Sequence, residues 1–185
     1  MKNRIIETAE KRFYQYGYRK VTMDDIASDL GISKKTLYQY FKNKDAIASA
    51  VVKRLHHDIE RLQKRARKEI SDPIERFAEV IAEISSRITR IGSAFMSDIK
   101  KDIPELWKRC EEFREKDINE YIEGILKEGI KKERIKKEIN TKIALLSYLG
   151  AIRTIFQPEI FAKNTFSIEE AFENIIKIFL KGIER

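Results

Sequence analysis

Side chains that can donate and accept hydrogen bonds gather between residues 34 and 40, where the chain reads K-K-T-L-Y-Q-Y. On a helix with 100° per residue, Leu37 and Phe41 face one side. The residues that then point most directly outward are Lys35, Thr36 and Gln39, flanked by Tyr38 and Tyr40. Ammonium, hydroxyl, amide and methyl groups match the base edges and phosphates of a DNA major groove. The pattern therefore predicts a helix that contacts DNA.

Lys34 and Lys35 begin this helix, where a positive charge opposes the helix dipole. Their placement makes better sense with a phosphate nearby. The alternative, for either lysine taken alone, is that it contacts no phosphate and only makes the protein surface soluble.

The stretch before this helix has the signals that would position it. Thr22 and Asp25 have the spacing of a capping box, so they predict a helix start. Gly31 suits a left-handed residue that ends that first helix. Ser33 can then cap the second helix. Helix, tight turn and helix, with their apolar faces inward, is the arrangement of a helix-turn-helix.

The distribution of charge also points to a polyanion. The chain has 185 residues and a net charge of +8. Residues 1–70 contain 17 Lys and Arg against 9 Asp and Glu, whereas residues 71–185 contain 21 of each. The whole excess thus surrounds the helix-turn-helix, as expected for a nucleic-acid-binding protein. A lysine-rich solvated surface is the alternative interpretation.

Other chemistry finds little support. His56 and His57 are adjacent, so on a helix they face about 100° apart and cannot jointly hold a metal. Cys110 is the sole cysteine, which excludes an intramolecular disulfide and fits a reducing compartment. Phosphate-loop, zinc-protease and nucleophile-elbow motifs are absent from the sequence. We expect no metal and no cofactor.

No targeting signal is recognisable either. The N-terminus has no apolar segment of the signal-peptide type. No apolar run approaches the roughly 18 residues that span a bilayer. We expect a cytoplasmic protein without membrane contact.

Apolar periodicity and capping residues predict an all-α chain. A first helix over 3–17 completes a three-helix unit with the two helices above. Asn43 opens a long link helix that reaches about Glu69. Further helices are expected at about 73–90, 91–99, 104–129, 140–156 and 167–183.

The last two of these helices have more apolar and small residues than one core face needs. Surplus apolar surface usually marks an interface, and a two-fold dimer through both helices gives a four-helix bundle. The predicted interface residues are Ser147, Gly150, Ala151, Thr154, Phe172, Ile176, Phe179 and Leu180. A crowded monomer core is the alternative.

Aromatic and aliphatic residues of the middle helices could line a ligand pocket, or equally a core, which is the preferred interpretation for each one alone. The candidates are Phe77, Ile81, Ile88, Phe95, Met96, Trp107, Cys110, Phe113, Tyr121, Tyr148, Arg153 and Phe156. Arg153 lies in an apolar helix, where an unpaired buried charge is expensive. It would pair with an internal carboxylate, anchor an anionic ligand or reach solvent.

The stretch T-M-D-D-I-A-S-D-L-G-I-S-K-K-T-L-Y-Q-Y-F-K-N-K-D-A-I resembles the tetracycline-repressor (TetR) family of bacterial transcription regulators. The preceding A-E-K-R-F-Y-Q-Y-G-Y is similar to that family's first helix. The resemblance covers about residues 4–52, and beyond it only the architecture agrees. It implies about nine helices, dimeric repression of promoters, and release by a small molecule bound among the middle helices.

The resemblance also implies roles for single residues. The positions that touch phosphate in the family are Thr22, Ser33, Lys34, Thr36, Tyr38, Tyr40 and Lys44. Lys35 and Gln39 fall at base-reading positions. Lys35 departs from the usual Gly or Ala, so it could block a close backbone approach or contact a guanine. Tyr40 replaces the commoner His and keeps a hydroxyl for phosphate.

We therefore expect a helix-turn-helix DNA-binding domain over 1–59, with the motif at about 22–41, and a ligand-binding and dimerisation domain over 60–185. The expected function is a homodimeric transcriptional regulator, a repressor released from a palindromic operator by a small hydrophobic or amphipathic effector. A constitutive DNA-binding protein without effector and a small helical enzyme with a central cavity are the alternatives.

Overall fold

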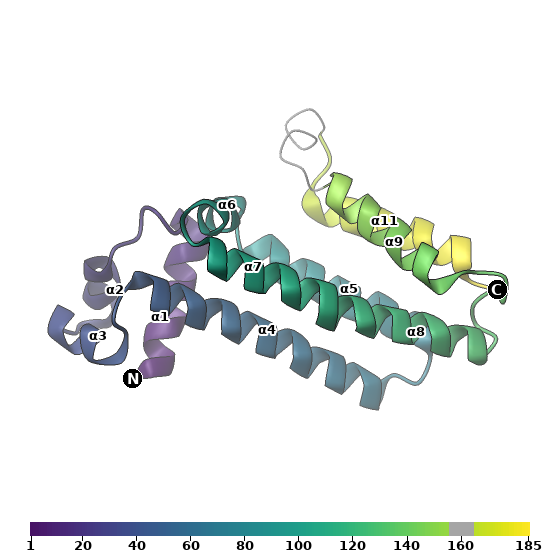
Figure 1. Cartoon of the computed structure of the whole chain (residues 1–185), viewed down its shortest axis with the longest axis horizontal. Coiled ribbons are helices and arrows are strands. Elements are labelled where there is room, and N and C mark those ends of the chain that lie inside the picture. Colours follow the sequence, from purple (N-terminus) through teal and green to yellow (C-terminus); the bar gives the residue numbers. More distant parts are fainter. Residues whose placement is uncertain (156–164) are drawn as a thin grey trace. The chain divides into compact units, whose positions relative to one another are not determined.

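The computed structural model describes residues 1–155 and 165–185, and it is α-helical as predicted (Figure 1). The N-terminal helices are α1 (Lys2–Tyr16), α2 (Met23–Leu30), α3 (Lys34–Tyr40) and α4 (Lys44–Glu69). They are followed by α5 (Pro73–Arg90), α6 (Ser93–Asp102), α7 (Pro104–Phe113) and α8 (Asn119–Lys131). The last described helices are α9 (Thr141–Ile155) and α11 (Ile168–Ile183).

One helix differs from the sequence prediction. The segment expected as a single α-helix from residue 104 contains a π-helical turn, η1 (Arg114–Ile118), between α7 and α8. Neither glycine nor proline occurs in this turn, so no local signal marks it. If α7, η1 and α8 are counted as one continuous helix, the described residues form nine helices, which agrees with the prediction.

The chain divides into two compact units. The first comprises Met1–Glu60 and Arg90–Phe113, and the second comprises Arg61–Thr89 and Arg114–Arg185. The first unit thus contains α1 to α3, the start of α4, and the helices α6 and α7.

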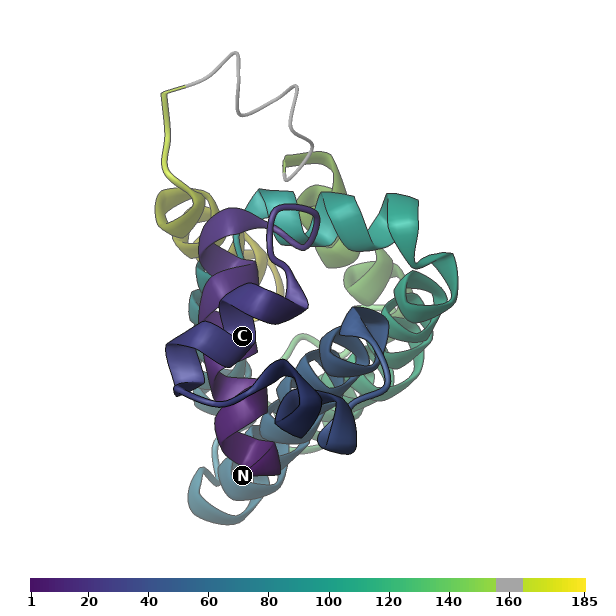
Figure 2. The ribbon, with the colours of Figure 1, turned by 90° about the vertical axis from the view of Figure 1, so that its left-hand side faces the viewer.

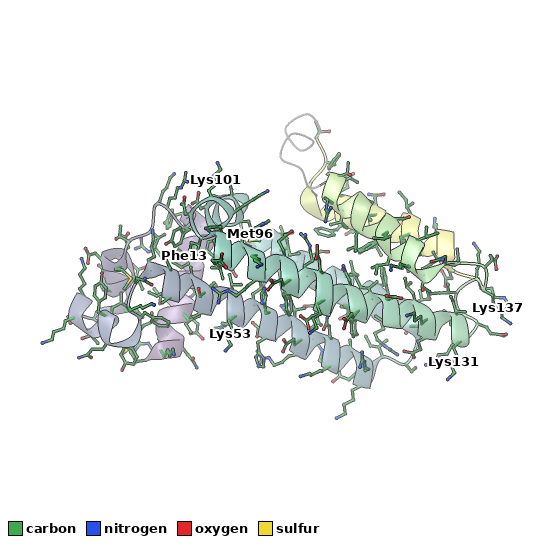
Figure 3. All side chains as sticks on the ribbon, in the orientation of Figure 1. Phe13, Lys53, Met96, Lys101, Lys131 and Lys137 are labelled. Carbon is green, nitrogen blue, oxygen red and sulfur yellow. The ribbon has the colours of Figure 1, made fainter. Side chains whose placement is uncertain are left out.

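The core of the first unit joins α6 to the helix-turn-helix. Phe13 of α1, which is labelled in Figure 3, is fully buried. Its ring stacks on that of Phe95 of α6, with ring centroids 5.5 Å apart. Ile26 of α2, Leu37 of α3 and Ile47 of α4 are also fully buried in this cluster. Burial of such side chains contributes roughly 1.5–3 kcal/mol each, so α2 and α3 are held by a shared apolar core.

Two features organise the second unit. Phe77 of α5, Tyr148 of α9 and Phe179 of α11 form an aromatic cluster with centroids 5.2–5.4 Å apart. Arg76, only 4% exposed, pairs with Glu128 of α8. The helices α9 and α11 lie side by side (Figure 1).

Replacement of Gly92 by alanine should destabilise the first unit by about 2–3 kcal/mol. Gly92 precedes α6 with φ +67°, and a Cβ there would lie 2.6 Å from the carbonyl oxygen of Tyr14. The backbone of Tyr14 cannot easily yield, because it belongs to α1. Urea unfolding followed by circular dichroism measures the change.

Gly124→Ala is the matched control. Gly124 lies inside α8, where a Cβ would meet no atom within 4 Å. Alanine there should raise stability by up to about 1 kcal/mol. Equal effects of the two substitutions would contradict the assignment of Gly92 as a close-approach position.

Candidate nucleic-acid interface

The predicted helix caps hold α2 and α3 in place. The Thr22 hydroxyl accepts from the backbone N–H of Asp25 (3.1 Å), and the Asp25 carboxylate accepts from the backbone N–H of Thr22 (2.8 Å). Gly31 ends α2 in the left-handed conformation, with φ 64° and ψ 33°. The Ser33 hydroxyl then accepts from the backbone N–H of Thr36 at 3.0 Å. The capping box, the glycine stop and the second cap are all confirmed.

The orientation of α3 agrees largely with the helical projection. Leu37 is fully buried and Phe41 is 5% exposed. Lys35 and Gln39 are exposed on the opposite side. Together with the exposed rings of Tyr38 (45%) and Tyr40 (43%), they present a polar and aromatic surface. Such a surface can contact base edges and phosphates.

Thr36 departs from the expected outward position. It is half-buried, and its hydroxyl shares a 2.8 Å hydrogen bond with that of Ser33. The reason is its place in the first turn of α3, directly above the capping residue. Its methyl and hydroxyl are therefore less available than the side chains of Lys35 and Gln39.

Ion pairs surround the motif. The Lys34 ammonium donates to the Asp24 carboxylate of α2 at 2.9 Å. The Arg12 guanidinium of α1 forms two hydrogen bonds of 2.6 and 2.5 Å with Asp29. That contact lowers the pKa of Asp29 and fixes α2 against α1.

Lys44, expected at a phosphate-contacting position, has two protein acceptors. Its ammonium donates to the carbonyl oxygens of Tyr18 and Val21, each at 2.9 Å, and lies 4.0 Å from the Tyr18 ring centroid. Burial lowers the pKa of Lys44. The Tyr18 hydroxyl in turn donates to Asp45. Lys44 thus fastens the loop before α2 to the start of α4, and its phosphate contact stays a prediction.

The predicted pocket residues belong to both units. Those in the first unit are Phe95, Met96, Trp107, Cys110 and Phe113. Those in the second are Phe77, Ile81, Ile88, Tyr121, Tyr148 and Arg153. Phe95 and Phe77 are core residues, whereas Ile88 is 44% exposed. Arg153 is exposed in the last turn of α9, so it reaches solvent. Phe156 lies outside the described residues.

The structure also contains an open groove that the sequence did not indicate. It measures about 290 Å³ in the first unit and is lined by Ser49, Ala50, Val52, Lys53, His56, Leu106 and Arg109. None of the predicted pocket residues lines this groove. His56 stacks on Phe113, with ring centroids 3.9 Å apart.

The predicted interface residues of α9 and α11 differ in exposure. Ser147, Gly150 and Thr154 are exposed, and Phe172 is buried. The half-buried members are Ala151, Ile176, Phe179 and Leu180. Sequence reasoning missed Ile143 (63% exposed) and Leu146 (60% exposed). Their spacing of three residues on α9, opposite the buried Ala144 and Tyr148, could have identified them.

Residues 1–155 and 165–185 contain no group of three His, Cys, Asp or Glu side chains arranged to hold a metal ion. Within the same ranges, no helix is long and apolar enough to cross a membrane.

Comparison with known proteins agrees with the geometry of the motif. Residues 5–51 match the family described as "Bacterial regulatory proteins, tetR family". The HTH-type transcriptional regulator YvaF of Bacillus subtilis (strain 168) is 25% identical over 184 residues, which cover 99% of this chain and 95% of YvaF. The biofilm operon icaADBC HTH-type negative transcriptional regulator IcaR of Staphylococcus epidermidis is 31% identical over 120 residues, covering 57% of this chain and 63% of IcaR.

A solved structure supports the fold over the whole length. The transcriptional regulator FadR from Bacillus subtilis, in complex with stearoyl-CoA, matches all of this chain and all of its own with a TM-score of 0.73 and 23% identity. At that identity the likeness shows the fold alone. Residues 5–51, which contain the capped helix-turn-helix, therefore have the sequence pattern and the local geometry of the tetR family of bacterial regulatory proteins.

Proposed function

We propose that this protein is a homodimeric transcriptional repressor that binds a palindromic operator and leaves it when a small hydrophobic or amphipathic effector binds. The observation that carries the proposal is the exposed face of α3, which is anchored by the buried Leu37. This helix lies within residues 1–70, the part of the chain that contains the whole net charge of +8. Such a helix can enter a major groove while the surrounding charge attracts the phosphates.

Each side chain on this face has a distinct role. Lys35 is exposed and can donate to the O6 and N7 acceptors of guanine, and Gln39 can pair with adenine. The hydroxyl groups of Tyr38 and Tyr40 can donate to phosphate oxygens. Base reading therefore depends on Lys35 and Gln39, whereas the tyrosines position α3.

Dimerisation supplies the second copy of α3 that a palindromic operator requires. The exposed Ile143 and Leu146 of α9 and Ile178 of α11 (73% exposed) give these neighbouring helices an apolar face. The small exposed side chains of Ser147 and Gly150 allow close approach of another helix. A two-fold axis through this face would produce two copies of α3 for the two half-sites of a palindrome.

Two similar proteins support the regulatory direction and the type of effector. IcaR is a negative transcriptional regulator by its name, and FadR was solved with stearoyl-CoA, a large amphipathic molecule. An effector releases DNA only if it binds better to the DNA-free conformation, and a coupling of about 1–3 kcal/mol is typical.

Titration of a palindromic promoter fragment at several salt concentrations tests the proposal. Because phosphate contacts dominate affinity, log K should fall steeply with log salt. Lys35→Ala should change the preferred base at one operator position, at a cost of about 1–3 kcal/mol on the original sequence. Lys11→Ala, an exposed lysine of α1, is the charge-matched control and should leave the preference unchanged. A flat salt dependence would reject DNA binding, and an unchanged preference in Lys35→Ala would reject its base-reading role.

A further inference from the structure

The two ends of α3 differ in the balance of charge around them. We propose that the electrostatic contact with DNA phosphates lies at the C-terminal end of α3, through Lys2 and Lys42, while Asp24 neutralises Lys34 at the N-terminal end. This inference rests on the proposed DNA binding and says which cations hold the phosphates.

At the N-terminal end, the Lys34 ammonium is engaged. It lies 2.9 Å from a carboxylate oxygen of Asp24, and both side chains are more than half exposed. The same hydrogen bond raises the pKa of Lys34. Asp24 belongs to the first turn of α2, where the helix dipole favours a negative charge. A phosphate that approaches Lys34 therefore meets the Asp24 carboxylate beside it.

At the C-terminal end, one cation comes from α1 and a second lies in the segment between α3 and α4. The Lys2 ammonium lies 5.6 Å from the ring centroid of Phe41, the residue that ends α3. The first turn of α1 therefore lies beside the end of α3 (Figure 2). Lys42 follows Phe41 directly and is exposed, and the preceding Tyr40 exposes its ring. Two ammonium groups and a phenol are therefore the phosphate donors available at this end of α3.

The acidic residues nearest to this end in sequence have other partners. Glu7 and Glu10 of α1 both lie near Arg54, with N–O distances of 3.0 and 3.7 Å. The Asp45 carboxylate accepts a hydrogen bond from the hydroxyl of Tyr18. Among the described residues, neither Lys2 nor Lys42 forms an ion pair, so both charges are uncompensated.

The difference between Lys2 and Lys42, which form no ion pair among the described residues, and the paired Lys34 determines how DNA binding depends on salt. A protein cation releases counterions from DNA when it neutralises a phosphate, and each such contact contributes about 0.9 to the slope of log K against log salt. A lysine that already has a carboxylate partner brings no net charge to the phosphate. Lys2 and Lys42 should therefore each contribute to the slope, and Lys34 should not.

Salt-dependent titration of the full-length protein with operator and random duplexes tests the inference. Lys2→Ala and Lys42→Ala should each reduce the slope by about 0.9 and weaken both duplexes equally. Lys34→Ala should leave the slope unchanged. Asp24→Asn should increase the slope by about 0.9 and tighten binding to the random duplex several-fold, because it frees Lys34. Lys11→Ala again serves as the charge-matched control.

Two outcomes would overturn the inference: a slope reduced by Lys34→Ala as much as by Lys2→Ala, or a slope unchanged by Asp24→Asn. Asp24→Asn is a gain of binding, so a folding defect cannot mimic the expected result. A flat slope for the unmodified protein rejects the proposed function itself. A steep slope with the wrong pattern among the variants rejects only this assignment of the phosphate contacts.

Discussion

Replacement of Leu146 by glutamate is expected to convert the protein from a dimer to a monomer and to abolish its binding to a palindromic operator. Leu146 is 60% exposed on α9, and Ile178 is 73% exposed on the neighbouring α11. In the proposed dimer both side chains leave water. A carboxylate at this position would be buried without a partner, at a cost of several kcal/mol.

Symmetry increases the effect. A two-fold interface contains every substitution twice, so the dimer carries two buried carboxylates close to one axis. The dimer dissociation constant should rise by at least about 100-fold. Sedimentation or light scattering measures this directly, because the unmodified protein should have about twice the chain mass of 21.8 kDa and the variant the mass of one chain.

Ile88→Glu is the matched control. Ile88 is also a large exposed residue of the second unit (44%), but it lies on α5 rather than on α9 or α11. This variant should stay dimeric and keep its operator affinity. A dimeric Leu146→Glu protein, or a monomeric Ile88→Glu protein, would place the interface elsewhere.

The helix ends could be predicted because they depend on local chemistry. Asn43 accepts from the backbone N–H of Ala46 at 2.9 Å, and Ser167 accepts from that of Glu170 at 3.1 Å. Asp72 accepts from the N–H groups of the two residues after Pro73. Each cap involves side chain and backbone within three residues, so a short window of sequence contains the whole interaction.

Contacts between distant segments could not be predicted in this way. The pairing of Lys34 with Asp24 depends on the angle between α2 and α3, and a helical projection of α3 contains no information on it. The half-burial of Thr36 has the same origin, because it depends on the position of the Ser33 side chain. The exposed face of α3 could therefore be predicted from its own sequence, whereas the neutralisation of Lys34 by a residue of α2 could not.

The buried arginine of the second unit is not the one that the sequence singled out. Arg153 was singled out because its helix is apolar, yet it is exposed in the last turn of α9. Arg76 is the buried one, at 4% exposure, although Glu75 precedes it and Glu79 follows three residues later. It lies on the face of α5 that also buries Phe77 and Val80, and its partner Glu128 is 52 residues away.

Removal of that partner is expected to have a large effect on stability. The Arg76 guanidinium donates to both Glu128 oxygens, at 2.7 and 3.2 Å, and also to the carbonyl oxygens of Ile70 and Ser71. Lys132 contacts the same carboxylate at 2.8 Å. This network joins the segment after α4, the start of α5 and the end of α8. Glu128→Gln leaves a buried cation without its counter-charge.

The effect should depend on pH in a defined direction. The hydrogen bonds from Arg76 and Lys132 lower the pKa of Glu128 from its ordinary 4.5 to about 2. The stabilisation is therefore fully present above pH 4.5 and is lost as the pH falls toward 2. Since the Glu128 side chain is 32% exposed, solvent screening reduces the value that the shift alone implies. We expect Glu128→Gln to cost about 2–3 kcal/mol at pH 7.

Urea unfolding at pH 7 and at pH 3 separates this effect from a general loss of packing. At pH 3 the unfolded chain already protonates Glu128, so the difference between the two proteins should shrink. Glu123→Gln is the control on the same helix: Glu123 pairs with Lys127 at 2.7 Å, but Lys127 is 65% exposed. An exposed pair contributes little, so this variant should unfold like the unmodified protein at both pH values. A loss in Glu128→Gln that is equal at pH 7 and pH 3 would show that shape, not charge, makes Glu128 important.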